Sequence, residues 1–347
     1  MARVAVTGAA GYLASWVVKL LLEQGHTVHG TVRSLQDGRK LAHLQRLSAE
    51  HPGRLVLFEA DLLKAQGFDA AMEGCSAVVH TASPYRLGTS ADPERELIAP
   101  AVEGTRHVLE AVNRTASVQR VVVTSSIVAM YGDSVELQAR PGQALAETDV
   151  NRTSTAQSNA YALSKTRAEA LAWDMQARQN RWSMVSVHPG AIFGPSLSQR
   201  DDATSVQLLR QFLDGSFRQG VPELWLGTVD VRDVAQAHVS AALLPGASGR
   251  YIVVGESLRL LEIAQRLRQS HPNRSARLPT KEVPKWLMWL IAPAAGMARR
   301  YVRHNVGHPM QFDTTRSRTE LGVAYRPALD TLGEHVEQLV ADGLAPA

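Results

Sequence analysis

The stretch "VTGAAGYLAS", residues 6–15, decides the fold that the sequence predicts. It joins the apolar run "RVAVT", residues 3–7, to the start of a helical pattern. In such a turn Gly8 permits a tight backbone bend and Gly11 lets the main chain approach a phosphate group. Ala14 is small enough for the helix to pack closely on the strand. Two glycines near a turn are weak evidence for a phosphate-binding turn on their own, so this interpretation depends on the pattern of the rest of the chain.

Short apolar runs alternate with helical patterns through the first half of the chain. This alternation is typical of a parallel sheet that helices cover on both faces, and it predicts an α/β fold with a Rossmann-type doubly wound sheet. The helices include one from Gly11 to about Gln24. The predicted strands lie at residues 3–7, 26–32, 54–60, 76–82, 120–126 and 183–190.

The pattern changes after His188, where Pro and Gly become frequent and strands such as "RYIVVG" at 250–255 look isolated. We therefore divide the chain into a nucleotide-binding domain, residues 1–188, and a smaller mixed α/β region that binds substrate. This second region spans residues 189–347, and segments around 228–255 are expected to return to the first domain. Ligands of open parallel sheets bind beyond the carboxyl ends of the strands, so the site is expected there.

Composition favours a soluble globular protein. The 347 residues carry a net charge of +4 with 45% apolar residues, and the Lys and Arg residues are scattered, so nucleic-acid binding is not expected. Cys75 is the only cysteine and no signal peptide is evident, which favours the cytoplasm. The apolar run from Trp286 to Ala298 is too short to span a bilayer. A buried helix is the leading interpretation of this run, and a membrane-surface or pocket-lining segment is the alternative.

The glycine turn after the first strand of an alternating chain predicts a dinucleotide site at the start of the first helix. The second strand ends in "TVRSLQDGRK", without the carboxylate that would favour NAD. Arg33 and Lys40 suit a 2′-phosphate instead, so the sequence predicts NADPH; a solvated basic loop is the alternative. Asp61 and Leu62, after the third strand, are candidate neighbours of the adenine ring, although Asp is also common in turns.

The stretch "AYALSKTRAEALAWDMQAR" predicts a helix from about Asn159 to Gln179 that carries Tyr161 and Lys165 on one face. An ammonium group beside a phenol lowers the pKa of the phenol and makes it a usable acid or base. A surface Tyr and a surface Lys would give the same spacing. However, Ser126 also ends a strand, in "VVVTSS", and a nicotinamide site is predicted nearby. Together these groups fit hydride transfer to a carbonyl.

The chain resembles the extended short-chain dehydrogenase/reductase family, through its TGxxGxxG-type loop and its YxxxK pair. Ala14 replaces the third glycine, which sterics tolerate. Within the family, "TVRSLQDGRK", "YALSKTRAEALAWD", "HPGAIFGP" and "VDVRDVAQAHV" are similar to the dihydroflavonol reductases, cinnamoyl-CoA reductases and microbial NADPH-dependent aldehyde reductases. The resemblance covers residues 1 to about 240. Val150 stands where many relatives carry Trp, so their substrate preference does not transfer.

The resemblance implies roles for individual residues. Ser126, Tyr161 and Lys165 would be catalytic, with Ser125 as the alternative serine. Asp230 and Arg232 would be structural. The residues implied in cofactor binding are Gly8, Ala10, Gly11, Tyr12, Leu13, Arg33, Lys40, Asp61, Leu62, Thr81, Ala82, Ser83, Thr124, Ser125, Tyr161, Lys165, Pro189, Gly190, Ala191 and Ile192.

The sequence therefore predicts an NADP(H)-dependent oxidoreductase that interconverts a carbonyl and an alcohol, with Tyr161 as the acid or base. Phe212, Trp225 and Met288 suggest an apolar, aromatic or alicyclic small-molecule substrate. The alternatives are a steroid 3β-hydroxyl dehydrogenase, a nucleotide-sugar epimerase or dehydratase on the same fold, and an NADPH-sensing regulator without activity.

Other sites have little support. His304 and His308 lack a third ligand, so no metal is expected. No G-x-S-x-G turn supports a serine hydrolase. The helices at 94–113 and 159–179 could form a homodimer interface, as in relatives, and no integral membrane segment is expected.

Overall fold

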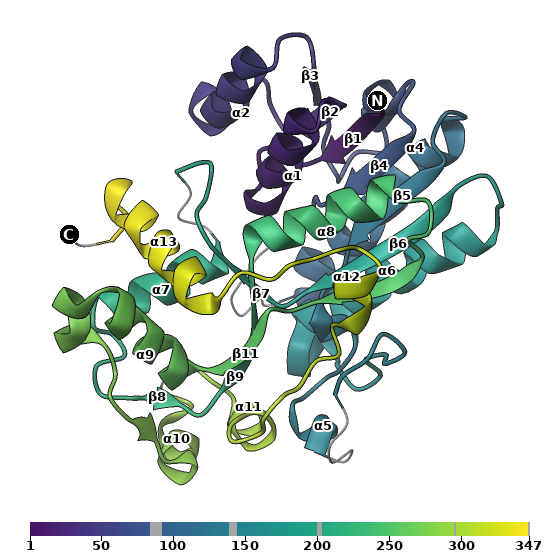
Figure 1. Ribbon diagram of the computed structural model, residues 1–347. Helices are drawn as coiled ribbons and strands as arrows, with labels where there is room; N and C mark the ends of the chain where they lie inside the picture. Colours follow the sequence, from purple (N-terminus) through teal and green to yellow (C-terminus); the bar gives the residue numbers. More distant parts are fainter. Residues whose placement is uncertain (84–91, 139–143, 200–202, 295, 346–347) are drawn as a thin grey trace.

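A seven-stranded parallel sheet runs through the centre of the computed structural model, which describes residues 1–83, 92–138, 144–199, 203–294 and 296–345 (Figure 1). Every neighbouring pair of its strands is parallel, in the order β10-β6-β5-β4-β1-β2-β3. The predicted fold class is confirmed. The strands are β1 (Arg3–Thr7), β2 (Thr27–Val32), β3 (Leu55–Glu59), β4 (Ala77–His80), β5 (Arg120–Thr124), β6 (Ser183–Pro189) and β10 (Gly249–Val253).

The strand order reverses between β1 and β4, where Thr7 lies opposite His80. Main-chain and side-chain hydrogen bonds join the two strand ends: the Thr81 hydroxyl donates to the Thr7 carbonyl at 2.6 Å, and the Ala82 N–H donates to the Thr7 hydroxyl at 3.2 Å. A reversal of this kind leaves a crevice at the carboxyl edge of the sheet, where ligands bind in open α/β folds.

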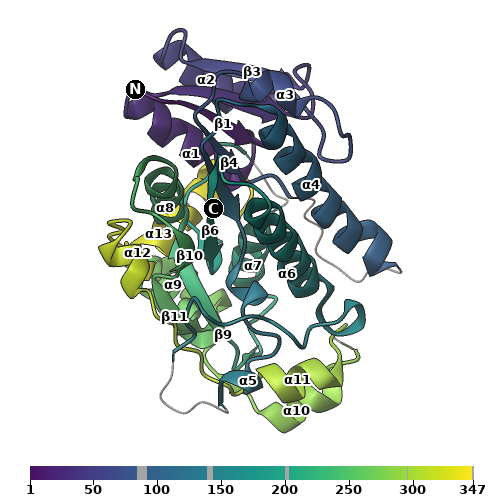
Figure 2. The same ribbon diagram turned by 90° about the vertical axis from the view of Figure 1, so that its right-hand side faces the viewer.

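Helices cover both faces of the sheet because its strands alternate their side chains between two cores. Val4 and Val6 point into one core, with α1, α2 and α8, whereas Ala5 points into the other, with α3, α4 and α6. In Figure 2, α4 and α6 lie side by side on their face of the sheet. The helices are α1 (Tyr12–Glu23), α2 (Gly38–Glu50), α3 (Phe68–Met72), α4 (Ala99–Arg114), α6 (Ala156–Ala177) and α8 (Val231–Leu243).

Two long helices differ in detail from the sequence prediction. The helix predicted at 94–113 is a π-helical turn, η1 (Glu94–Ile98), followed by α4, and Pro100 lies at the junction. Proline cannot donate a main-chain hydrogen bond, so the bonding pattern changes there. In α6, Asn159 leaves helical geometry, and its side chain accepts a hydrogen bond from the Ala162 N–H at 3.1 Å. Asn159 therefore caps the regular helix, and Tyr161 lies in its first turn.

The remainder of the chain builds a second core beyond the carboxyl edge of the sheet. Phe193, Phe212, Ile263 and Val336 belong to this core. The strands are β7 (Ala191–Phe193), β9 (Trp225–Asp230) and β11 (Glu256–Arg259) in one sheet, and β8 (Val221–Pro222) and β12 (Glu282–Val283) in another. The helices are α5 (Val135–Gln138), α7 (Thr204–Leu213), α9 (Leu260–Ser270), α10 (Lys285–Ile291), α11 (Arg299–Asn305), α12 (Thr315–Thr319), α13 (Ala328–Ala341) and the 3₁₀ turns η2 (Ile127–Ala129) and η3 (Pro272–Arg277).

The strand at 250–255, which looks isolated in the sequence, is β10; it pairs with β6 and completes the central sheet, so this segment returns to the first domain. One expectation about this region is wrong. The apolar run from Trp286 does not form a buried helix, because Met288 is the only buried residue of α10 and Trp286 is 66% exposed. Apolar runs do not specify which strand pairs with which, or which side of a helix a neighbour covers. Within the described residues, no helix is long and apolar enough to cross a membrane.

Candidate active site

The glycine turn between β1 and α1 is shaped by close contacts. Gly8 has a φ of +67°, and a Cβ added to it would lie 3.0 Å from the Cβ of Ala82. A Cβ on Gly11 would lie 3.0 Å from the Gly8 carbonyl oxygen. The turn therefore leaves a cradle that side chains would fill, at the positive end of α1, and this fits a pyrophosphate.

Gly30 also shapes the cradle, although it is not among the residues predicted from the sequence. A Cβ on Gly30 would lie 2.8 Å from the Cβ of Ala9, and the Ala9 N–H donates to the Thr31 carbonyl at 2.8 Å. The strand β2 can therefore approach the glycine turn only without a side chain at position 30. A lone glycine inside the apolar run "HTVHGTV" was the available signal.

Besides the two glycines, three residues of the turn are predicted to bind cofactor, and two of their side chains have structural contacts. Leu13 is buried in the core under the sheet. The Tyr12 hydroxyl donates to the Gly194 carbonyl, and burial raises the pKa of this phenol. Ala10 is half-buried. Any contact of Tyr12 or Leu13 with a phosphate would therefore come from the main chain at the helix start.

The predicted phosphate pair, Arg33 and Lys40, lies beside the end of β2. Arg33 is exposed, whereas the Lys40 ammonium lies 2.8 Å from the Asp37 carboxylate. Asp37 also caps α2, because its side chain accepts a hydrogen bond from the Lys40 N–H at 3.2 Å. The hydrogen bond with Lys40 lowers the pKa of Asp37. A 2′-phosphate would compete with Asp37 for Lys40, so Arg33 is the better candidate anchor.

Asp61 and Leu62 follow β3 and have local partners. Asp61 accepts a hydrogen bond from the Leu63 N–H at 3.0 Å, which is the turn role weighed as the alternative. Leu62 packs against α4, where a Cβ on Gly104 would lie 3.1 Å from its own Cβ. Its carbonyl also interacts with His107 Nδ1 at 2.8 Å. A role beside adenine stays a prediction for both residues.

Lys165 of the predicted Tyr–Lys pair reaches the switch point of the sheet. Its ammonium donates to the Ser83 hydroxyl at 3.3 Å, and the residue is only 9% exposed. Burial lowers the pKa of Lys165 to about 8, while the carboxylate of Glu169 acts to raise it. Burial, followed by the charge of Lys165, lowers the pKa of His80 to about 3, so this imidazole is neutral. Tyr161 lies one turn before Lys165 on the same helix face.

The side chains of the three polar residues at the end of β5 have different hydrogen-bond partners. Thr124 shares a hydrogen bond with His238 Nε2 at 2.8 Å, on the face that α8 covers. The Ser125 hydroxyl donates to the Glu169 carboxylate at 2.7 Å and is buried. Ser126 is half-buried, and within the part of the chain that the structure describes its hydroxyl accepts a single long bond, of 3.4 Å, from the Val128 N–H. Of the two candidate serines, Ser126 is therefore the one with a hydroxyl that can turn to a substrate.

The segment 189–192 leads from the central sheet into the second core. Gly190 is essential to this path because a Cβ on it would lie 2.1 Å from the Gly227 carbonyl oxygen. Its N–H donates to the Val253 carbonyl at 3.1 Å. Ala191 and Ile192 begin β7 and are half-buried. Their contact with a nicotinamide ring stays a prediction.

The three apolar residues proposed to face a substrate lie in three separate clusters of the structure. Phe212 is wrongly predicted, because it is fully buried in the second core. Met288, on α10, is buried in a small cluster with Val302 of α11. Trp225 is half-buried in an apolar cluster with Tyr131 and Phe312. These three aromatic residues share the cluster with Ile127, which directly follows Ser126 in the chain.

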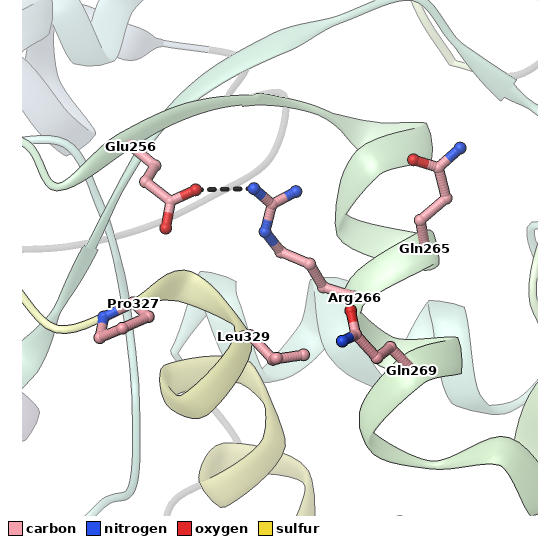
Figure 3. Close-up of a pocket in the computed structure, with 6 residues that line it drawn as sticks. All are labelled: Glu256, Gln265, Arg266, Gln269, Pro327 and Leu329. Atoms are coloured by element: carbon pink, nitrogen blue, oxygen red, sulfur yellow. Dashed lines mark hydrogen bonds and ion pairs between the residues drawn. The ribbon is translucent and has the colours of Figure 1, made fainter.

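Other polar features lie away from this site. Figure 3 shows a hollow of about 400 Å³ between α9 and α13, lined by neither the glycine turn nor the Ser126 region. There, Arg266 pairs with Glu256 at 2.7 Å, and Glu256 accepts a hydrogen bond from the Ala328 N–H. His304 contacts Asp133 at 3.1 Å. Among the residues that the structure describes, no group of three His, Cys, Asp or Glu side chains could hold a metal ion.

A glycine cradle at the switch point of a parallel sheet defines a dinucleotide-binding α/β fold. A family model described as "NAD dependent epimerase/dehydratase family" matches residues 4–255. The chain is 40% identical to cinnamoyl-CoA reductase CAD2 of Medicago truncatula over 280 residues, which are 80% of this chain and 83% of that protein. It is 35% identical to tetraketide alpha-pyrone reductase 1 of Arabidopsis thaliana over 342 residues, 98% of this chain and 96% of that protein.

A similar solved structure is the yeast methylglyoxal/isovaleraldehyde reductase Gre2 complexed with NADPH. It matches with a TM-score of 0.80 and 28% identity, covering 99% of each chain. The protein therefore belongs to the NAD dependent epimerase/dehydratase family, which comprises extended short-chain dehydrogenases/reductases. The family prediction is confirmed.

The buried Lys165 predicts a pH dependence of stability. Between pH 8 and 10.5 the folded protein has lost a proton that the unfolded chain still holds, so the free energy of unfolding rises with pH. Relative to Lys165→Met, the wild type should gain about 3 kcal/mol across this range, at about 1.4 kcal/mol per pKa unit. Urea unfolding at four pH values measures this gain.

The exposed Lys64 provides the matched control. Lys64→Met should differ from the wild type by a constant amount across the same range. A constant difference for Lys165→Met as well would contradict the burial of a low-pKa ammonium.

Proposed function

We propose that the protein is an NADPH-dependent reductase that reversibly converts a carbonyl group of an apolar, aromatic or alicyclic substrate into an alcohol. The broader class, an NADP(H)-dependent oxidoreductase, is confirmed by relatives named as reductases and by the NADPH-bound structure of Gre2. One observation carries the finer proposal: the buried Lys165 contacts Ser83, three residues after the end of β4 and beside the glycine cradle.

Each proposed catalytic group has one task. When bound, the nicotinamide supplies a hydride, with its two electrons, to the carbonyl carbon. Tyr161 donates its hydroxyl proton to the carbonyl oxygen as the C=O π electrons move onto that oxygen. Ser126 donates a hydrogen bond to the same oxygen and orients it. In alcohol oxidation the proton returns to the tyrosinate.

Lys165 supports this proton transfer by its charge. A tyrosinate one helix turn away is stabilised by the ammonium, most strongly where water is excluded. The contact with Ser83 fixes the ammonium at the carboxyl edge of the sheet. Because burial lowers the pKa of Lys165 only to about 8, the group remains charged at neutral pH.

The surroundings of Ser126 support an apolar substrate. Ile127, the residue after Ser126, belongs to a buried apolar cluster, and the rings of Tyr131, Trp225 and Phe312 pack against this cluster while staying partly exposed. Relatives named as cinnamoyl-CoA and anthocyanidin reductases act on aromatic compounds, which is consistent with such a cluster. Aromatic rings bind aromatic substrates through dispersion and offset stacking.

The catalytic assignment is tested by Tyr161→Phe, with NADPH absorbance followed over aromatic, aliphatic, dicarbonyl and steroid carbonyls. Loss of the general acid should lower kcat by about 10² to 10⁴. The Kd for NADPH, measured by fluorescence titration, should remain within about twofold, because the hydroxyl is needed for the reaction rather than for folding.

Comparison of the two serines provides the control. Ser126→Ala should reduce kcat by at least about tenfold more than Ser125→Ala, because only Ser126 can reach the carbonyl. A larger loss in Ser125→Ala would contradict the assignment, as would full activity in Tyr161→Phe.

The cofactor preference is tested by Arg33→Ala. Removal of the guanidinium should weaken NADPH binding about tenfold and leave NADH binding unchanged, since only NADPH carries the 2′-phosphate. Arg46→Ala changes another exposed arginine, on α2, and should affect neither cofactor. Equal losses for NADPH and NADH in Arg33→Ala would contradict the role of Arg33.

A further inference from the structure

A charged cluster lies buried behind Ser126, and the proposed reaction does not use it. Glu169 on α6, His188 on β6 and Arg250 on β10 form the cluster. Glu169 is 5% exposed and His188 is fully buried. Buried charges are costly unless they are paired and fully hydrogen-bonded, so a cluster of this kind calls for an explanation.

Glu169 is the centre of this cluster. Its carboxylate accepts from the Ser125 hydroxyl at 2.7 Å, from Arg250 Nε at 2.8 Å and from the Ser186 hydroxyl at 3.2 Å. Trp173 Nε1 donates to it at 3.2 Å. Burial acts to raise the pKa of Glu169, but His188 and Arg250 outweigh burial and hold it well below its usual range. The carboxylate is therefore charged and satisfied on both oxygens.

His188 extends the cluster to the main chain of Ser126. Its Nε2 lies 3.1 Å from the Glu169 carboxylate, and its Nδ1 lies 3.1 Å from the Ser126 carbonyl oxygen. A carbonyl oxygen only accepts hydrogen bonds, so Nδ1 carries the hydrogen and donates it. Glu169 thus holds Ser125 directly and orients the imidazole that holds the peptide of Ser126.

Arg250 ties the same carboxylate to the loop before α6. Its Nη1 donates to the carbonyls of Glu147 at 2.8 Å and Asp149 at 2.5 Å. Two residues later, the Asn151 side chain donates to the Val128 carbonyl at 2.8 Å, close to Ser126. The Glu169 carboxylate therefore bonds Ser125 directly on one side of the Ser126 turn. Through Arg250 it is linked to the loop that bonds Val128 on the other side.

Glu169 also lies one helix turn after Lys165 and two turns after Tyr161. These spacings place all three on the same side of α6. The helix that carries the proposed acid and the strand that carries the proposed serine are consequently held in register by one buried carboxylate.

We propose that Glu169 is a positioning residue that fixes Ser126 relative to Tyr161 and Lys165. The proposal rests on the reductase function proposed above. Proton donation and carbonyl orientation require the two hydroxyls at fixed places, and a displacement of about 1 Å can cost about a hundredfold in rate. The cluster prevents such a displacement by joining α6, β5, β6 and β10 through bonds that are directional and shielded from water.

The test is a double-mutant cycle with Glu169→Gln and Ser126→Ala. Glutamine keeps the shape of the side chain but removes the charge and one acceptor oxygen. In the wild-type background Glu169→Gln should lower kcat by about 10- to 100-fold, with the Kd for NADPH within about twofold. In the Ser126→Ala background the same change should lower kcat less than about threefold, because the group it positions is already absent.

Asp233→Asn is the matched control for simple destabilisation. Asp233 is another buried carboxylate, on α8, and it pairs with Arg326 rather than with the groups around Ser126. Its variant should lose stability in urea without a change in kcat. If Glu169→Gln does not fold, Ser125→Ala removes one bond of the same carboxylate, and its several-fold loss should disappear in the Ser126→Ala background.

Four outcomes overturn the proposal or the function on which it rests. Equal factors for Glu169→Gln in both backgrounds, or an unchanged kcat in the wild-type background, overturn the positioning role of Glu169. An equal loss of kcat in Asp233→Asn shows that destabilisation accounts for the effect. Absence of any carbonyl reduction by the wild type, by contrast, is a failure of the proposed function itself.

Discussion

The burial of the Lys165 ammonium is the constraint on which the proposed site depends. A buried cation requires partners, and Lys165 finds the Ser83 hydroxyl at 3.3 Å and the charge of Glu169 one turn along α6. These contacts bring α6 against the end of β4, where the strand order reverses. The same burial that lowers the pKa of Lys165 also strengthens its electrostatic effect on a neighbouring phenol.

At the switch point, where this cation lies, the fold brings the ends of the strands close together. Gly8 and Ala82 lie so close across the ends of β1 and β4 that a Cβ on Gly8 would crowd Ala82, and Gly30 allows β2 to approach the glycine turn. Helix α1 then starts with its N–H groups facing the crevice. The nucleotide cradle and the Tyr–Lys helix consequently meet along one edge of the sheet, from opposite faces.

Much of this arrangement could be predicted from the sequence, because local patterns encode it. The alternation of apolar runs and helices specified the parallel sheet, and the glycine spacing specified the turn after β1. Helical periodicity placed Tyr161 and Lys165 on one face. Each of these inferences needs only residues that are close in the chain.

The remaining features depend on contacts between distant residues. Adjacent serines are equivalent in sequence, and only the position of Glu169 shows that Ser125 points away from the site. The salt bridge of Lys40 with Asp37, the burial of Phe212 and the exposure of Trp286 likewise follow from packing. The Glu169 cluster joins three strands and a helix, so no local pattern reveals it.

Transfer of deuterium is the most direct test of the proposed reduction. NADPH deuterated at C4 would be incubated with the protein and a panel of aromatic and aliphatic carbonyls, and the products examined by NMR. If Tyr161 donates the proton, the wild type should form an alcohol with deuterium on the former carbonyl carbon, and Tyr161→Phe should not. Tight binding of NADPH with no deuterated alcohol from any carbonyl would contradict the proposed reduction.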